Sequence, residues 1–236
     1  MNEKIKYKHL MNPYVRDVFL SYLIDGARRT VPDGYPIIER WMVATEVPED
    51  IYQWDCRGEA KGKESVSGMS FYCGDPGFTP VLNDPKKYVD KLRQYQCVIG
   101  MDGSPFDNMP PIVQKSQIYN NLAITYYYGS QGIKIVPNVR LGNDDTLGML
   151  DAIPRNCLIA IGTNGFTWRL ENRELFKRQV SIIVERLKPT GIIVYGQAYE
   201  DVFESAIKAE IPIYQKDSHT IKRNKQLKEQ KSQGVA

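Results

Sequence analysis

Short apolar runs alternate with small and polar clusters along the second half of the chain. Runs of β-branched residues that stop at Gly, Asn or Asp are typical of strands buried on both faces of a parallel sheet. Helical spacing separates several of them, as in the predicted helix over 171–188. The pattern therefore predicts an α/β fold with mainly parallel strands. The five predicted strands cover 97–101, 133–136, 158–161, 192–194 and 211–214.

The first half of the chain is less regular. Further strands are predicted over 37–45, 51–54 and 70–73, an exposed loop over 57–68, and a turn at 74–77. Eight strands favour an irregular (βα)-barrel-like fold, and the alternative is an open doubly wound parallel sheet of five strands. Helices are predicted over 13–24, after Asp84-Pro85, after Pro110-Pro111 and over 199–208.

Charge separates a body from a tail. The chain has 236 residues and a formal net charge of +3, and a single α/β domain over 1–215 accounts for its length. The basic C-terminal tail over 216–236 holds six Lys and Arg against two Asp and Glu. Such a tail predicts salt-sensitive attraction to nucleic acid or an acidic protein partner. The favoured alternative is a frayed, solvated chain end.

Composition excludes several classes of protein. No apolar stretch approaches the roughly 20 residues that span a bilayer, so the sequence predicts a cytoplasmic protein without a membrane partner. The four scattered cysteines predict neither a disulfide framework nor a four-cysteine zinc site. The two histidines, His9 and His219, lie near the termini, which argues against catalysis by paired histidines. No cofactor is predicted.

Asp102 is the candidate catalytic residue. It follows a predicted strand and precedes Gly103 and Ser104 in a tight turn, at the edge where the ligand sites of parallel α/β folds gather. A carboxylate there suits a general base, a nucleophile or a metal ligand. The alternative is that Asp102 accepts hydrogen bonds from turn amides.

Polar residues after the next strand add candidate ligand contacts. Asn138 and Arg140 follow the strand over 133–136, and the planar guanidinium suits a phosphate or carboxylate. Asn143-Asp144-Asp145 with Asp102 offers oxygen ligands for Mg²⁺, the candidate metal. The favoured alternative is that Asp144 or Asp145 caps a short helix over 146–150.

Two later strands end in further candidates. Thr163 lies in the loop Thr163-Asn164-Gly165, whose small residues suit an approaching anion, although an ordinary turn is the favoured alternative. Tyr195 ends its strand beside Gly196, where a phenol can hydrogen-bond or stack on a ring. The triplet Tyr126-Tyr127-Tyr128 is interpreted as packing, with at least one ring in the core and another at the surface.

The chain resembles a bacterial and phage domain-of-unknown-function family, catalogue number 4417, found in mobile elements. Segments that resemble that family extend from Asn12-Pro13-Tyr14 through Tyr195-Gly196. These include 83–88, 97–99 with Asp102 and Ser104, Met109-Pro110 with Gln114, and 132–137. Ser104 and Gln114 join the candidate ligand contacts on this basis. Gly103 and Arg140-Leu141 depart from the family pattern, which has a bulky aromatic and a Ser-Trp pair there.

Two functions follow from these observations. The first is a barrel-like enzyme of a phage or mobile element that acts on a nucleotide, a sugar phosphate or a nucleic-acid end through Asp102. The second is a non-catalytic protein that binds nucleic acid or a host protein. The sequence predicts a small anionic ligand for the first and use of the basic tail for the second. It sets neither the oligomeric state nor the reaction.

Overall fold

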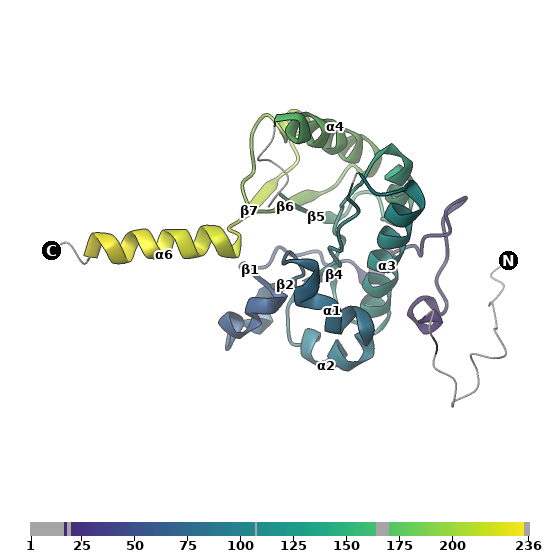
Figure 1. Ribbon diagram of the computed structural model, residues 1–236, viewed down its shortest axis with the longest axis horizontal. Helices are drawn as coiled ribbons and strands as arrows, with labels where there is room; N and C mark the ends of the chain where they lie inside the picture. Colours follow the sequence, from purple (N-terminus) through teal and green to yellow (C-terminus); the bar gives the residue numbers. More distant parts are fainter. Residues whose placement is uncertain (1–16, 18–19, 107, 164–169, 234–236) are drawn as a thin grey trace.

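A computed structural model describes residues 17, 20–106, 108–163 and 170–233, and it confirms the α/β fold with parallel strands (Figure 1). The described residues form two parallel sheets, in the orders β1-β2-β3-β4 and β5-β6-β7. The strands are β1 (Asp50–Gln53), β2 (Ser67–Ser70), β3 (Cys97–Ile99), β4 (Ile135–Val136), β5 (Leu158–Gly162), β6 (Gly191–Tyr195) and β7 (Ile213–Lys216).

Helices connect and cover these strands. The α-helices are α1 (Asp75–Asn83), α2 (Val89–Leu92), α3 (Pro111–Ser130), α4 (Leu170–Leu187), α5 (Glu204–Lys208) and α6 (His219–Gln233). The 3-10 helices are η2 (Ser21–Ile24), η3 (Arg40–Met42), η4 (Trp54–Ala60), η5 (Glu64–Val66), η6 (Pro85–Tyr88) and η7 (Asp144–Ala152). In Figure 1, α4 lies along the second sheet, whereas α1 and α2 lie beside the first.

Strand residues alternate between two kinds of core. In β3, Val98 joins an apolar cluster with the helices that cover the first sheet, whereas Cys97 and Ile99 join a different cluster. That second cluster also contains Val136 of β4 and Ile193 of β6, so it draws on both sheets. The strands are thus buried on both faces, as their continuous apolar sequences predict.

The two sheets meet between β4 and β5. Asn138, just after β4, forms a parallel bridge with Ala160 of β5, and the Ala160 N–H donates to the carbonyl of Pro137 at 2.8 Å. On the other side, the Lys216 Nζ of β7 donates to the carbonyl of Glu49, next to β1, at 2.9 Å. A barrel and an open sheet both stay predictions at this point.

Several predicted elements differ from the structure in the first half of the chain. The strand over 37–45 is wrong, because Arg40–Met42 form η3 and only Val43 makes an isolated parallel bridge, to Ile135 of β4. The turn at 74–77 is also wrong, because Asp75 and Pro76 begin α1, where proline is favoured. The loop over 57–68 largely forms η4 and η5 and then enters β2, and most of the helix over 13–24 lies outside the described residues, which contain η2.

The later predictions hold more closely. The helices at 111 and 171 are confirmed as α3 and α4, whereas the helix over 199–208 shortens to α5. The segment after Asp84-Pro85 forms η6 and the short α2. The three consecutive tyrosines all lie buried along α3, which corrects the expectation that one faces solvent. None of the described helices is long and apolar enough to cross a membrane.

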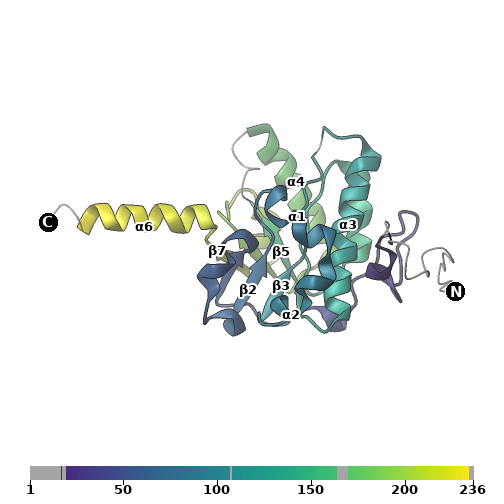
Figure 2. The ribbon, with the colours of Figure 1, turned by 60° about the horizontal axis from the view of Figure 1, so that its bottom comes forward.

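The basic tail contains a helix. Residues His219–Gln233 form α6, which extends away from the rest of the protein in two views (Figures 1 and 2). Its first turn is attached to the body, because the Lys222 Nζ pairs with Asp50 at 2.7 Å and the His219 ring contacts Glu59 at 3.1 Å. Side chains from 223 to 230 are exposed. The tail, for which a frayed chain end was the favoured interpretation, therefore contains a helix with exposed charged side chains.

Candidate functional site

Asp102 lies buried at the carboxyl end of β3. Its Oδ2 accepts a hydrogen bond from Arg140 Nη1 at 2.9 Å, and its Oδ1 accepts one from Asn138 Nδ2 at 2.8 Å. The side chain of Asp102 is 7% exposed and that of Arg140 is 21% exposed. Strand ends bring these residues together, as the sequence predicts, but both carboxylate oxygens already have partners.

Gly103 lets the loop after Asp102 lie against α3. The Gly103 N–H donates to Asn121 Oδ1 at 3.0 Å, and Asn121 Nδ2 donates back to the Gly103 carbonyl at 2.8 Å. A Cβ at position 103 would come within 1.8 Å of Gln117 Nε2. Where the family pattern has a bulky aromatic residue, this chain thus has a glycine whose backbone lies directly against α3.

Ser104 extends the polar group toward α1. Arg140 Nη2 donates to Ser104 Oγ at 3.3 Å, and Ser104 Oγ donates to Asp75 Oδ1 at 3.3 Å. Asp75 is the first residue of α1, where a carboxylate is favoured by the free amides of the helix. Ser104 therefore connects the Arg140 guanidinium to a second acidic side chain, Asp75, which the sequence pattern does not reveal.

Two stacked tyrosines lie beside this polar group. The ring centroids of Tyr72 and Tyr195 are 4.9 Å apart with an interplanar angle of 14°. The Tyr72 hydroxyl donates to Asn138 Oδ1 at 2.8 Å. Gly162 makes room for the stack, since a Cβ there would lie 2.6 Å from the Tyr72 ring. Tyr72 was missed because one tyrosine after a strand gives no signal of its stacking partner.

Tyr195 joins three parts of the protein. Its side chain is fully buried, at 1% exposure of the residue. The hydroxyl donates to Gln53 Oε1 at 3.1 Å and accepts from the His219 N–H at 3.0 Å. Thr163 lies next to it, because the Thr163 N–H donates to the Tyr195 carbonyl at 3.1 Å. Asn164 and Gly165 lie outside the described residues.

Gln114 lies farther along the same surface of α3 and is fully buried. Its Nε2 donates to the Met109 carbonyl at 2.8 Å, and its Oε1 accepts from the Asn143 N–H at 2.8 Å. These bonds attach the loop that follows Arg140 to the start of α3. Its contacts give Gln114 a role in positioning that loop, and its predicted ligand contact stays a prediction.

Burial dominates the electrostatics of this group. Burial raises the pKa of the Asp102 carboxyl above its ordinary value, and the Arg140 charge and the Asn138 hydrogen bond oppose that rise. Burial also raises the pKa of the Tyr72 phenol, with a further contribution from the Asp102 charge. Both phenols of the stack are therefore neutral hydrogen-bonding groups at physiological pH.

Little open space remains around Arg140. It lines two cavities of about 10 Å³ each, one shared with Asp102 and Gln179 and the other with Asn121 and Asn138. Each has room for about one water molecule. A nucleotide or sugar phosphate therefore has to bind at the exposed edge of Arg140 or after a rearrangement of the surrounding side chains.

The predicted acidic metal ligands have other partners. Asp144 pairs with Arg178, and the Asn143 side chain caps η7 by accepting from the Asp145 N–H at 3.1 Å. The cap is thus Asn143, one residue before the predicted pair. Within the described part of the chain, these carboxylates and Asp102 do not form a group of three within 4.8 Å. Magnesium binding there stays a prediction.

Comparison with known proteins places the chain in a family. The family described as "Domain of unknown function (DUF4417)" matches residues 34–214, which include β1 to β6, the start of β7 and all the predicted site residues. The chain belongs to this family. The resemblance seen in the sequence is thereby confirmed.

Two relatives of this DUF4417 protein come from phages. The "Gene 1 protein" of Mycobacterium phage L5 is 25% identical over 153 residues, which are 64% of this chain and 67% of the relative. The "Gene 1 protein" of Mycobacterium phage D29 is 23% identical over 155 residues, or 65% of this chain and 57% of the relative. No solved structure matches the chain. The comparisons thus place DUF4417 relatives in phages.

Proposed function

We propose that this protein binds nucleic acid through its phosphate backbone, using α6 and the groove at the base of that helix. The observation that carries the proposal is the helix α6, which projects from the body (Figures 1 and 2). Its basic side chains Arg223, Lys225 and Lys228 are exposed. Positive side chains on one exposed element attract the polyanionic backbone by releasing its counterions. Phosphate contacts carry no base information, so the binding is independent of sequence.

The groove beside α6 extends this basic surface to the body. It has a volume of about 720 Å³. Lys222 and His219 are engaged with Asp50 and Glu59, whereas Lys63 and Arg223 have no ion pair with any described residue and are exposed. The groove therefore offers two positive charges to a phosphate. Its lining residues are Asp50, Tyr52, Glu59, Lys63, His219, Lys222, Arg223 and Gln226.

The anchored base of α6 favours a rigid binding element. His219 and Lys222 attach the first turn to η4 and β1, and the Lys222 Nζ also lies 4.7 Å from the centre of the Tyr52 ring. Arg223 and Lys228 continue along the exposed part of the helix. An anchored helix loses less conformational freedom on binding than a disordered tail does.

Removing two charges from α6 tests this function. We expect the Arg223→Gln/Lys228→Gln variant to reduce the slope of log affinity against log salt concentration by about 2 on duplex DNA, since each lost phosphate contact removes about 0.9. Fluorescence anisotropy with a labelled duplex at several salt concentrations measures the slope. The binding should persist with an unrelated duplex sequence.

A matched variant controls for net charge. Arg155 and Lys188 are exposed, and they precede the amino ends of β5 and β6, whereas α6 follows the carboxyl end of β7. The Arg155→Gln/Lys188→Gln variant loses the same charge and should keep the wild-type slope. An equal loss of slope in both variants would show that binding follows overall charge and not α6.

For the fold, we infer that the two sheets form one irregular barrel. Support comes from the apolar cluster that contains residues of both sheets, from the Asn138–Ala160 bridge, and from the contact of Lys216 with Glu49. In a barrel, this cluster is the interior and the strand ends form one mouth. Residues 1–215 then form one domain, from which α6 projects.

A small anionic ligand at the mouth is the second candidate function. The favouring observation is the convergence of Asp102, Ser104, Asn138 and Arg140, with Thr163 and Tyr195 beside them. Arg140 is partly exposed, so its guanidinium is the group that meets an incoming phosphate. Asp102 would then become available as the catalytic carboxylate.

Ligand-dependent thermal stability tests this second candidate. Adenosine monophosphate at 100 times its dissociation constant should stabilise the wild-type protein by about 2.7 kcal/mol. The Arg140→Met variant, compared with its own unliganded form, should show no shift in Tm, whereas Arg155→Gln should shift as the wild type does. Equal shifts in the two variants would place the ligand elsewhere.

A further inference from the structure

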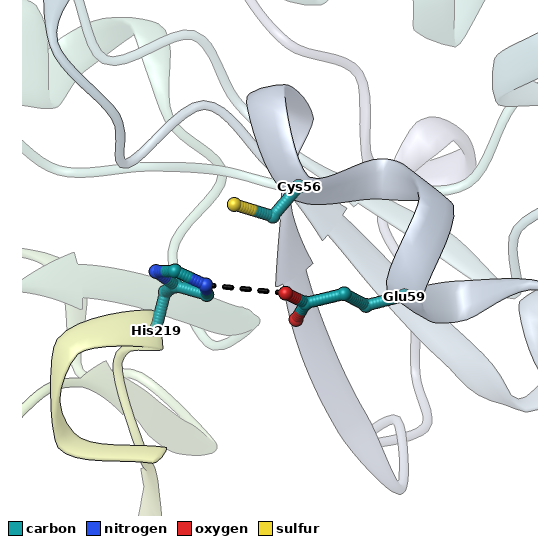
Figure 3. A group of neighbouring side chains, drawn as sticks. All are labelled: Cys56, Glu59 and His219. Carbon is teal, nitrogen blue, oxygen red and sulfur yellow. Dashed lines mark hydrogen bonds and ion pairs between the residues drawn. The ribbon is translucent and has the colours of Figure 1, made fainter. Parts of the chain in front are cut away.

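Three side chains with different metal-binding groups lie together at the base of α6 (Figure 3). Cys56 and Glu59 come from η4, and His219 is the first residue of α6. The Cys56 sulfur, a Glu59 carboxylate oxygen and a His219 ring nitrogen all lie within 4.8 Å of one another. The side chains point toward a common space, and His219 Nε2 is 3.1 Å from Glu59 Oε1.

We propose that Cys56, Glu59 and His219 bind one Zn²⁺ ion. Thiolate, imidazole and carboxylate are the three protein ligands of zinc, whereas Mg²⁺ and Ca²⁺ select oxygen ligands. Tetrahedral zinc bonds of about 2.0–2.3 Å hold ligand atoms roughly 3.3–3.7 Å apart. Because the ligand atoms already lie within 4.8 Å of one another, a contraction of at most about 1.5 Å brings the cluster to that spacing.

A second layer of hydrogen bonds orients these ligands. Gln53 Nε2 donates to the Cys56 sulfur at 3.6 Å, while Gln53 Oε1 accepts from the Tyr195 hydroxyl at 3.1 Å. The same hydroxyl accepts from the His219 N–H at 3.0 Å. Such outer partners fix the positions of metal ligands and increase metal affinity. These hydrogen bonds therefore attach the cluster to the buried Tyr195.

Charge balance also suits a divalent ion. On binding, the Cys56 thiol releases one proton to solvent and forms the zinc–sulfur bond, while the Glu59 carboxylate and the neutral His219 ring donate electron pairs. One thiolate and one carboxylate then neutralise Zn²⁺. The adjacent Lys222 is already paired with Asp50. A water molecule completes the fourth position, and the ion joins α6 to η4.

Metal titration of the untagged full-length chain tests the site. Isothermal calorimetry with Zn²⁺ should give one equivalent for the wild type. Cys56→Ser and Glu59→Gln should each weaken binding by at least about 100-fold, since loss of a direct ligand exceeds the 10- to 100-fold effect of outer partners. Cys73→Ser is the matched control, because its half-buried thiol lies outside the cluster and burial raises its pKa to about 12.

Cobalt supplies a spectroscopic measurement that reports the thiolate ligand directly. Co²⁺ occupies zinc sites, and its thiolate complex absorbs in the near ultraviolet. The band should appear with wild type and Cys73→Ser and be absent with Cys56→Ser, with urea unfolding curves confirming that each variant is folded. A wild type without the band, or a Cys56→Ser variant that retains it, would overturn the proposal. DNA binding is measured separately, so failure of either proposal is distinguishable from failure of the other.

Discussion

The Arg140→Met variant should lose about 3 kcal/mol of its free energy of unfolding at neutral pH. The substitution leaves the ionised Asp102 buried with the Asn138 amide but without its positive partner. Removal of one member of a buried ion pair typically costs about 3–5 kcal/mol, and partial exposure of Arg140 favours the lower end. Urea unfolding followed by circular dichroism measures the loss.

The loss should depend on pH in a defined direction. Burial raises the folded-state pKa of Asp102, and loss of the Arg140 charge raises it further. A raised carboxyl pKa gives stability that is fully present below the unfolded value of about 3.9 and is lost as pH rises through the folded value. The difference between wild type and Arg140→Met should therefore be small in acid and grow toward neutral pH.

A double variant separates charge from packing. Asp102→Asn in the Arg140→Met background removes the uncompensated carboxylate, so it should restore a measurable part of the lost stability. If the single variant is as stable as wild type at neutral pH, the pair does not hold the strand ends together. A double variant no more stable than the single one would assign the loss to packing of the Arg140 side chain.

Ile99→Ala is the second change with a large expected effect, about 3 kcal/mol. Ile99 is fully buried in the apolar cluster shared by both sheets, and truncation of such a residue typically costs about 2–5 kcal/mol through lost burial and the cavity left behind. In the proposed barrel the two sheets are joined, so amides of β5 and β6 should lose hydrogen-exchange protection together with those of β3. Ile193→Ala should act in the same way from the second sheet.

The control for this experiment is Ile112→Ala. Ile112 lies in α3 and is 73% exposed, so its truncation should change stability by no more than about 0.5 kcal/mol. If Ile99→Ala lowered protection in the first sheet alone, the sheets would unfold independently and the inferred barrel would be wrong.

The sequence predicts well those strands that are buried on both faces. Leu158–Gly162 and Gly191–Tyr195 are continuous apolar segments, and each forms a strand close to its predicted bounds. The segment over 37–45 is also apolar, and Ile38 and Met42 are buried in one cluster, but Arg40–Met42 form a 3-10 helix that interrupts the extended backbone. Apolar content without spacing therefore predicts burial better than it predicts the element.

The candidate residues at strand ends could be predicted because they follow recognisable apolar segments in the sequence. Asp102, Asn138 and Arg140 follow apolar strands directly, and parallel pairing of β3 with β4 then brings them together. Tyr72 and Asp75 join them from the segment after β2 and from α1, where the sequence predicted a strand over 70–73 and a turn at 74–77. Cys56 and His219 are 163 positions apart, so no spacing rule predicts their contact.

The hydroxyl of Tyr195 links the terminal helix to the closure of the strand ends. It accepts the first backbone N–H of α6, while its ring stacks on Tyr72, which in turn bonds Asn138. Detaching the helix would remove this N–H from the hydroxyl of a buried tyrosine at the end of β6. Anything that pulls on α6, a bound polyanion included, therefore acts through Tyr195 and Tyr72 on the buried Asn138 and on the Asp102 carboxylate that Asn138 binds.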